Sequence, residues 1–355
     1  MASKEKFIKG RGAQINPANK FHNWVYDQEP IDWADQSEDE PLLKTQFIPV
    51  YPKTIVNKVE SPDIPLEYSL NPYQGCEHGC IYCYARVTHQ FWGYSAGLDF
   101  EQKILVKKNA PELLAKKLQC KSWQAHSIMV SGNTDCYQPC ERQFQITRQL
   151  LETFWRYRHP VGLITKNSLI LRDLDILKKL ASEKLVHVAI SVTSLDESLR
   201  KFMEPRTASG LNRLKVIKKL TDEGIPVFAM LAPIIPGLND HEIFDLTKAT
   251  AEAGSLGCTF QIVRLNGEIG TIFEDWLEKT FPDKKEKVLN KIKSCHGGNL
   301  QDSRFNVRMR GEGKIAEVIA SQFQLAKRKY YEGREMPTYN VALHSQYKTG
   351  QLSLF

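Results

Sequence analysis

The sequence predicts an α/β protein built around a parallel sheet. From about residue 66 onward, short apolar runs alternate with segments that carry Leu, Ile or Val at three- and four-residue spacing. This alternation is typical of βα units, which form either an open doubly wound sheet or a barrel. The 355 residues allow one large domain with extensions, and the 42% of apolar residues suffice for a sizeable core.

Six segments have the length and composition of strands, and five have helical periodicity. The predicted strands are 66–70, 127–131, 161–165, 186–192, 226–231 and 258–265. The predicted helices are 141–157, 172–183, 207–223, 239–254 and 314–331. Gly224 and Pro226 end the third helix just before a strand, and Asn239 or Asp240 is placed to cap the fourth. In such folds functional groups follow the carboxyl ends of strands.

The alternating strands and helices fill residues 66–270, and the two ends of the chain differ from this region. Residues 1–65 begin with the basic stretch KGRGAQINPANK and continue into an acidic run, 32–40, with dense proline. We expect an irregular N-terminal extension lying on the surface. Residues 271–355 combine one helix with a polar tail, and we expect a C-terminal appendage.

The net charge, the apolar runs and the cysteine content restrict the classes of protein to which the chain can belong. The 48 Lys and Arg against 41 Asp and Glu give a net charge of +7, which permits a nucleic-acid partner without requiring one. No apolar run reaches the roughly 18 residues of a membrane helix, and the start MASKEKFIKG lacks a signal-peptide core. We therefore expect a cytoplasmic protein. The eight cysteines are too sparse for a disulfide scaffold, and three of them fall within eight residues.

These three cysteines give the strongest chemical signal. They stand in residues 71–86, NPYQGCEHGCIYCYAR, as Cys76, Cys80 and Cys83, directly after the first predicted strand. Gly75 and Gly79 let the backbone turn tightly around one centre. Thiolates are natural ligands of iron–sulfur clusters, and three of them leave one metal position open.

Two other interpretations compete with a cluster. A structural zinc needs a fourth ligand, which His78 or the pair Cys136 and Cys140 would supply. The second is a chance group of core cysteines, but Gly, Glu and His neighbours make a poor core strand.

The Cys-x3-Cys-x2-Cys spacing resembles that of the radical S-adenosylmethionine (SAM) superfamily. The resemblance implies a partial (β/α) barrel and a [4Fe–4S] cluster whose fourth iron chelates SAM. It also implies reductive cleavage of SAM to a 5′-deoxyadenosyl radical, with an electron donor such as a flavodoxin or ferredoxin. Tyr82 stands where this family places an aromatic residue beside the adenine.

A second motif, SGNTDCYQPCE at 131–141, follows the second predicted strand. The superfamily has a glycine- and glutamate-containing segment here, from which this chain departs. It is similar instead to the SplB-like, "DNA repair photolyase"-type group related to spore photoproduct lyase, which implies a damaged or modified DNA substrate. The cofactor-binding candidates in this motif are Gly132, Asn133, Thr134 and Asp135. Without the resemblance, the segment is an ordinary loop with a helix cap.

A third group of candidates follows the fourth strand. Ser191 and Thr193 point to one face by strand alternation, where hydroxyls bind a ribose. Arg206 is suited to pair with the methionine carboxylate. The resemblance to the group extends to Glu204. A polar strand face bonded to its own neighbours is the alternative for each hydroxyl.

Two further predictions concern cysteines and the tail. Enzymes of the spore photoproduct lyase type return hydrogen to product from an extra cysteine, which implies a catalytic Cys136 or Cys140; inert buried thiols are the alternative. The tail matches the peptide with which bacterial proteins dock on the sliding clamp, unless it packs on its own domain. Its contact residues are Gln351, Leu352, Leu354 and Phe355.

The sequence thus predicts a radical SAM enzyme with a DNA substrate. Residues 301–355 carry nine Lys or Arg against five acids, which favours DNA. A first alternative keeps the chemistry but gives it an RNA, peptide or metabolite substrate. A second, of another class, is a non-catalytic, metal-stabilised nucleic-acid-binding protein.

Overall fold

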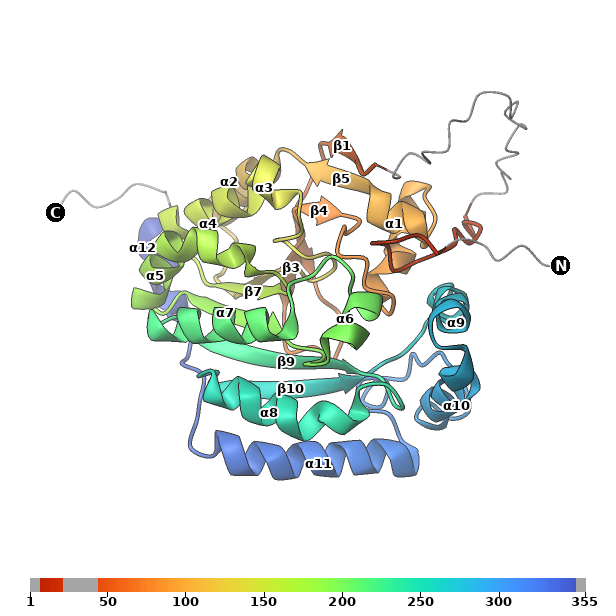
Figure 1. Ribbon diagram of the computed structural model, residues 1–355. Helices are drawn as coiled ribbons and strands as arrows, with labels where there is room; N and C mark the ends of the chain where they lie inside the picture. The colour runs from red at the N-terminus through yellow and green to blue at the C-terminus, as the bar shows by residue number, and fades with distance from the viewer. Residues whose placement is uncertain (1–6, 22–43, 349–355) are drawn as a thin grey trace, which may run out of the picture.

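The computed structural model describes residues 7–21 and 44–348. Its main feature is a seven-stranded sheet with the order β10-β9-β8-β7-β6-β3-β2 (Figure 1). The strands are β2 (Val56–Lys58), β3 (Tyr68–Leu70), β6 (Ile128–Val130), β7 (Val161–Thr165), β8 (Val186–Ser191), β9 (Val227–Ile234) and β10 (Gly257–Ile262). All neighbours are parallel except β2 and β3. The predicted parallel sheet is confirmed.

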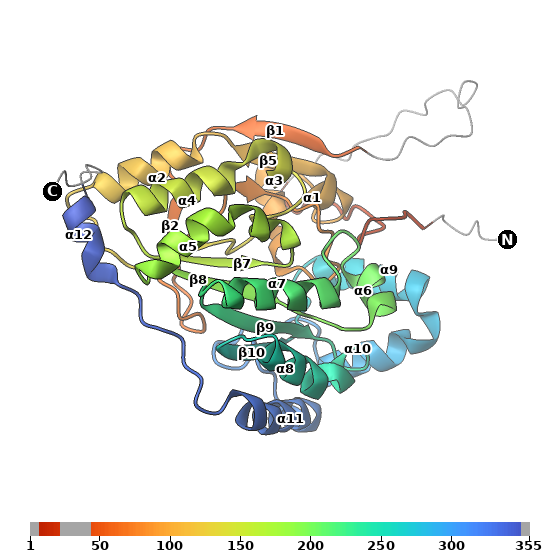
Figure 2. The ribbon, with the colours of Figure 1, turned by 60° about the vertical axis from the view of Figure 1, so that its left-hand side comes forward.

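Helices cover the outer face of this sheet (Figures 1 and 2). They are α2 (Ala110–Gln119), α4 (Ile146–Arg156), α5 (Leu174–Ser182), α7 (Gly210–Asp222) and α8 (Ile243–Glu252). Each presents one apolar stripe to the strands; in α4 this stripe includes Leu150, Leu151 and Phe154, all fully buried. Burial of such side chains contributes about 1.5–3 kcal/mol each. The other face of the sheet is therefore left to the loops that follow the strands.

The predicted helix 141–157 is interrupted at Gln145. This residue has a left-handed backbone, φ 51°, and separates α3 (Glu141–Phe144) from α4. The buried Glu141 carboxylate accepts the backbone N–H of Thr147 at 3.0 Å, so it satisfies the first turn of α4. Likewise, residues 172–183 divide into the 3₁₀ segment η3 (Ser168–Asp173) and α5.

The predicted cap of the helix after β9 is wrong. Neither Asn239 nor Asp240 caps α8, which is preceded by the 3₁₀ turn η4 (Asp240–Glu242). The Asn239 side chain instead accepts from the Ile235 N–H at 2.6 Å and donates to the Thr193 carbonyl at 2.8 Å. The amide therefore holds the turn after β9 against the chain that follows β8.

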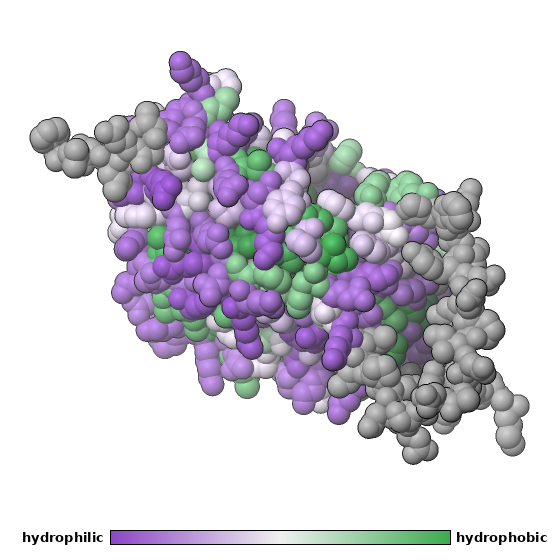
Figure 3. Space-filling view, turned by 90° about the horizontal axis from the view of Figure 1, so that it is seen from above, coloured by the Kyte–Doolittle hydropathy of each residue, from purple (hydrophilic) through white to green (hydrophobic). Residues whose placement is uncertain are grey.

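A second, smaller sheet was not predicted. It has the order β1-β5-β4 and consists of β1 (Gln46–Val50), β5 (Lys103–Lys107) and β4 (Tyr73–Gln74), with α1 (Leu98–Gln102) beside it. The end of the molecule that carries this small sheet is seen from above in Figure 3, and its surface is mostly hydrophilic with one hydrophobic area near the middle. Because β1 pairs with β5 and residues 11–14 include buried side chains, the expectation of an irregular, surface-lying extension is wrong for these residues.

The C-terminal residues pack at several places around the main sheet, and the last of those described reach the end of α4, where the His344 ring contacts the Tyr157 carbonyl at 2.7 Å. They contain α9 (Ile269–Thr280), η5 (Pro282–Lys284), α10 (Lys285–Ser294), α11 (Gly313–Tyr331), η6 (Val341–Leu343) and α12 (His344–Tyr347). α11 lies along α8 (Figures 1 and 2), and its Tyr331 hydroxyl contacts Thr250 at 2.9 Å. The boundaries at 65 and 270 stay predictions. None of the described helices is long and apolar enough to cross a membrane.

Candidate active site

The three cysteines lie on one loop between β4 and the 3₁₀ segment η2 (Tyr84–Trp92). Cys76 and Cys80 are buried, whereas Cys83 is partly exposed. The loop is anchored at both ends: the Cys76 N–H donates to the Phe100 carbonyl at 2.8 Å, and the Ile81 N–H donates to the Met203 carbonyl at 3.0 Å. The loop therefore has a fixed position relative to α1 and α6 (Glu197–Met203).

The electrostatics of the loop suit a metal–sulfur group. Burial raises the pKa of all three thiols, that of Cys80 to about 12. The charges of Asp135, Cys80 and Cys83 raise the pKa of Cys76 further. Buried thiolates need a compensating positive charge, which bound iron supplies. The donor set of three thiols therefore fits an iron–sulfur cluster.

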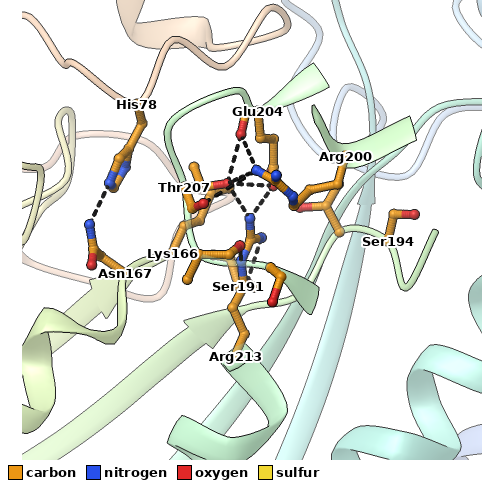
Figure 4. A network of polar contacts seen from close by, with 12 residues as sticks. His78, Lys166, Asn167, Ser191, Ser194, Arg200, Glu204, Thr207 and Arg213 are labelled. Carbon is orange, nitrogen blue, oxygen red and sulfur yellow. Dashed lines mark hydrogen bonds and ion pairs between the residues drawn. The ribbon is translucent and has the colours of Figure 1, made fainter. Parts of the chain in front are cut away.

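His78 is engaged within the protein. Its Nδ1 pairs with Asp135 at 3.3 Å, and its Nε2 lies 3.0 Å from the Asn167 amide (Figure 4). With both ring nitrogens committed, His78 is not placed to act as a fourth metal ligand.

Asp135 joins three loops at the carboxyl edge of the sheet. Besides His78, its carboxylate accepts from the Thr165 hydroxyl at 2.7 Å and the Lys166 N–H at 2.8 Å. Burial disfavours its ionised form, but the His78 charge and these hydrogen bonds leave its pKa below the usual value. Asp135 thus positions the cysteine loop and the chain after β7.

The rest of the second motif is also held by hydrogen bonds. The Asn71 side chain accepts from the N–H groups of Asn133 at 2.7 Å and Thr134 at 3.2 Å. The Thr134 hydroxyl donates to the Tyr73 carbonyl at 2.8 Å, and the Gly132 carbonyl accepts from the Tyr84 hydroxyl. Of the predicted residues here, Thr134 is buried, whereas Gly132, Asn133 and Asp135 are partly buried.

A buried network surrounds Glu204, shown in Figure 4. Its carboxylate forms an ion pair with Arg213 and accepts the hydroxyls of Tyr82 and Thr193, the latter at 2.7 Å. Burial opposes ionisation, yet the Arg213 charge leads the effects that lower the pKa of Glu204 to about 2. Tyr82, Thr193 and Glu204 are therefore brought together, and their polar groups satisfy one another.

Lys166 is a residue that the sequence analysis did not single out. It follows β7 directly, and its positive charge acts on the thiols of Cys80 and Cys83 and on Glu204. Within the described residues, its ammonium group has no ion-pair or hydrogen-bond partner. Its position at the carboxyl end of a predicted strand is the signal that could have revealed it.

Ser191 and Arg206 lie at different places around this centre. Ser191 ends β8 and is buried, and its carbonyl accepts from Arg213 at 3.1 Å. Arg206 is about one-third exposed and pairs with Glu77 of the cysteine loop at 3.4 Å. Arg206 therefore contacts the cysteine loop and already has an acidic partner there, whereas Ser191 contacts Arg213 of the Glu204 network.

The two candidate catalytic cysteines differ in their surroundings. Cys136 and Cys140 are both buried in the main core, and burial raises the pKa of both thiols. Glu77 and Cys76 of the cysteine loop contribute to the shift of Cys140, whereas Asp135 and Glu141 contribute to that of Cys136. The tail residues Gln351, Leu352, Leu354 and Phe355 lie outside the described residues.

Comparison with known proteins settles the family. The sequence profile of the Radical SAM superfamily matches residues 70–249, half of the chain, and this span contains the three cysteines. The chain belongs to the radical SAM superfamily. As a radical SAM enzyme it uses a [4Fe–4S] cluster and SAM. This family membership favours an enzyme over the alternative of a non-catalytic, metal-stabilised nucleic-acid-binding protein.

Relatives of this radical SAM protein are similar over most of their length. Uncharacterized protein Rv2578c of Mycobacterium tuberculosis is 31% identical over 240 residues, 67% of this chain and 71% of that protein. Uncharacterized protein MJ0683 of Methanocaldococcus jannaschii is 30% identical over 248 residues, 70% of this chain and 88% of that protein.

Solved structures show the same radical SAM fold. Spore photoproduct lyase complexed with dinucleoside spore photoproduct has a TM-score of 0.61 and 17% identity, covering 84% of each chain. A spore photoproduct lyase mutant with bound AdoMet and the same dinucleoside has a TM-score of 0.62 and 17% identity, covering 82% of each. The predicted fold class, a parallel sheet of the radical SAM type, is confirmed.

Proposed function

We propose that this protein cleaves SAM reductively and acts on a damaged or modified nucleotide of DNA. The observation that carries the first part is the buried three-cysteine loop at the carboxyl edge of the sheet, beside the unpaired Lys166. When bound, the cluster and SAM supply a 5′-deoxyadenosyl radical that abstracts hydrogen from the substrate.

The chain's own residues hold and orient these groups. Cys76, Cys80 and Cys83 bind the cluster, while Asp135 and Glu204 fix the surrounding loops through the bonds described above. Lys166, whose ammonium group has no ion-pair or hydrogen-bond partner among the described residues, offers the SAM carboxylate a cation. This role replaces the one expected of Arg206, whose charge already faces Glu77.

Other predicted contacts belong to the same proposal. Asn133, the backbone around Gly132 and Ser191 at the end of β8 are proposed to contact SAM, with the Tyr82 ring beside the adenine. Thr134 and Thr193 contribute indirectly, because their hydroxyls are bonded to the Tyr73 carbonyl and the Glu204 carboxylate. Cys140 is the better candidate for a hydrogen donor than Cys136, because its thiol interacts electrostatically with Glu77 and Cys76 of the cysteine loop.

Three arguments support a DNA substrate. The second motif is similar to that of the SplB-like group, the fold is that of spore photoproduct lyase, and a structure of that lyase holds a dinucleoside photoproduct. An RNA, peptide or metabolite substrate is the alternative. Docking of residues 351–355 on a sliding clamp, and a flavodoxin or ferredoxin as electron donor, remain predictions.

The test is an anaerobic assay of the cluster-loaded full chain with SAM and dithionite, with and without ultraviolet-irradiated DNA. We expect release of 5′-deoxyadenosine, stimulated by irradiated DNA and lost in Cys80→Ala. If irradiated and intact DNA give equal release of 5′-deoxyadenosine and neither is repaired, the proposal of a DNA substrate is wrong. SAM cleavage would still be supported by that release.

A further inference from the structure

Two exposed aromatic side chains lie on segments that pack beside the cysteine loop. Tyr84 follows Cys83 directly and is 53% exposed, and Phe305 is 52% exposed. Phe91, on the same 3₁₀ segment as Tyr84, differs from them because its ring stacks on Phe21, with ring centres 4.9 Å apart. Large aromatic side chains usually lose most of their surface to the core or to an interface. The exposure of Tyr84 and Phe305 therefore suggests a partner rather than a structural role.

Tyr84 stands at the mouth of the site. Its hydroxyl donates to the Gly132 carbonyl, so its ring bridges the cysteine loop and the loop after β6. About half of the side chain is nevertheless open to solvent. The ring is therefore held in place beside both loops while part of it stays accessible.

Arginines lie among these rings. Arg264, just beyond β10, begins a segment that packs on η2, where a Cβ atom on Gly267 would lie 3.3 Å from Val87 Cγ1. The same segment contacts the chain before residue 305, because the Asp302 N–H donates to the Asn266 side chain at 3.0 Å. Arg308 in turn stacks over the Phe305 ring, with its guanidinium carbon 4.5 Å from the ring centre. The surface thus extends from η2 to residues 305–310, and we call Tyr84, Phe305 and the arginines at 264, 308 and 310 the aromatic rim.

The charge of the rim is only partly neutralised. Arg308 pairs with Asp63, but the Arg264 Nη1 is buried without a hydrogen-bond partner, and within the described residues the exposed Arg310 side chain has no ion pair. A buried guanidinium nitrogen with no partner is costly, and an anionic group would satisfy it. The rim therefore combines free cationic donors with exposed aromatic faces.

We propose that the aromatic rim binds single-stranded DNA, stacking bases on Tyr84 and Phe305 while Arg264 and Arg310 contact phosphates. Rings interleaved with arginines are the arrangement by which proteins hold unpaired strands without reading their sequence. The choice of DNA rests on the proposed function, since a base beside the cluster must first leave the duplex. An acidic protein would need the cations but would leave the rings unexplained.

The test measures binding of the cluster-loaded full chain to a fluorescent single-stranded oligonucleotide by anisotropy, at several salt concentrations. Companion probes are the same length of abasic DNA, the matching duplex and single-stranded RNA. The variants are Phe305→Ala and Arg310→Ala. Their controls are Tyr51→Ala, a 71% exposed ring after β1, and Arg142→Ala, an exposed arginine on α3.

We expect Phe305→Ala to weaken binding about tenfold, as the loss of one stacked base requires, and to leave binding of abasic DNA unchanged. Arg310→Ala should weaken binding of normal and abasic DNA alike and lower the salt dependence by about one phosphate contact. The two control variants should bind as the unaltered protein does.

Either of two results would overturn the inference: equal binding of normal and abasic DNA, or loss of affinity no greater in the rim variants than in the controls. Tighter binding of RNA would overturn the assignment to DNA. Release of 5′-deoxyadenosine without DNA, measured on the same preparations, separates the two proposals. Binding without release defeats SAM cleavage alone, whereas release without binding defeats the rim alone.

Discussion

Gly12 of the N-terminal segment lies directly against Gly79 of the cysteine loop: a Cβ atom on Gly12 would lie 1.8 Å from the Gly79 carbonyl oxygen. The Gly12 N–H donates to Glu101 at 3.1 Å, and Glu101 pairs with the buried Arg86 at 2.6 Å. Arg86 in turn donates to the Cys80 carbonyl at 2.9 Å. Residues near the start of the chain therefore help to hold the loop that carries the cysteines.

This contact predicts that Gly12→Ala displaces the cysteine loop. Overpacking of this kind costs about 1–3 kcal/mol. We expect less iron and sulfide bound after anaerobic reconstitution. Lys9→Ala, at an exposed position in the same segment, is the matched control and should load normally. Full cluster loading in Gly12→Ala would show that the loop does not depend on this support.

The buried network around Glu204 predicts that a conservative substitution of this residue strongly lowers the free energy of unfolding. Glu204→Gln leaves the buried Arg213 charge without its partner, which costs about 3–5 kcal/mol. Glu197→Gln removes a more exposed partner of Arg200 and should cost about 1 kcal/mol or less. Urea unfolding of the two variants measures both values. A loss for Glu204→Gln no larger than for Glu197→Gln would argue against a stabilising role of the network.

Lys166 is predicted to act on SAM and not on folding. Lys166→Met removes a cation that has no partner within the described chain, so the free energy of unfolding should change little. Equilibrium dialysis with SAM should show affinity about tenfold weaker, since an ion pair with the SAM carboxylate is lost. Lys215→Met, at an exposed site on α7, is the control. Unaltered SAM affinity would assign the carboxylate to another residue.

The two buried cysteines of the second motif are predicted to differ. Because the Cys140 thiol interacts electrostatically with Glu77 and Cys76 of the cysteine loop, Cys140→Ser should lower substrate conversion while 5′-deoxyadenosine release continues. Cys136→Ser should behave as the unaltered enzyme does. The ratio of product to 5′-deoxyadenosine measures this coupling. Normal ratios in both variants would leave both thiols as core residues.

His159 predicts a loss of stability at acid pH. Its Nε2 accepts from the Trp123 indole N–H at 3.1 Å, and burial lowers its pKa to about 3. Because the unfolded side chain titrates near 6.5, the stabilisation is complete above that pH and declines as the pH falls toward 3. Between pH 7 and 5 the free energy of unfolding should fall by about 2 kcal/mol from this group. Urea titrations of His159→Gln should show a correspondingly smaller decline; an unchanged decline would contradict this origin.

Much of the main sheet was predictable because its strands are apolar and follow one another along the chain. Residues 161–165 were predicted and form β7 with the same bounds. The small sheet was missed because β4 has two residues and β1 pairs with β5, more than fifty positions later. The break at Gln145 was missed because it depends on the Glu141 carboxylate, which periodicity does not register.

The candidate site also contains features that the sequence predicted and features that it did not. The cysteine loop was visible because spacing alone brings three thiols together, and the family comparison supports the chemistry. The burial of Thr193 and Glu204 in one network with Arg213 depends on how α6 and α7 pack, which strand alternation does not determine. The approach of Gly12 to Gly79 joins segments without apolar periodicity, so no pattern in the sequence indicated it.

The central claim is that three cysteines hold a cluster able to cleave SAM. The most direct measurement is 5′-deoxyadenosine formed from SAM by anaerobically reconstituted protein and dithionite, compared with the Cys76→Ala, Cys80→Ala and Cys83→Ala variants. The account predicts an iron-loaded protein that releases 5′-deoxyadenosine, and no release from any of the three variants. Iron-loaded protein that leaves SAM intact, or a variant that still cleaves it, would contradict the account.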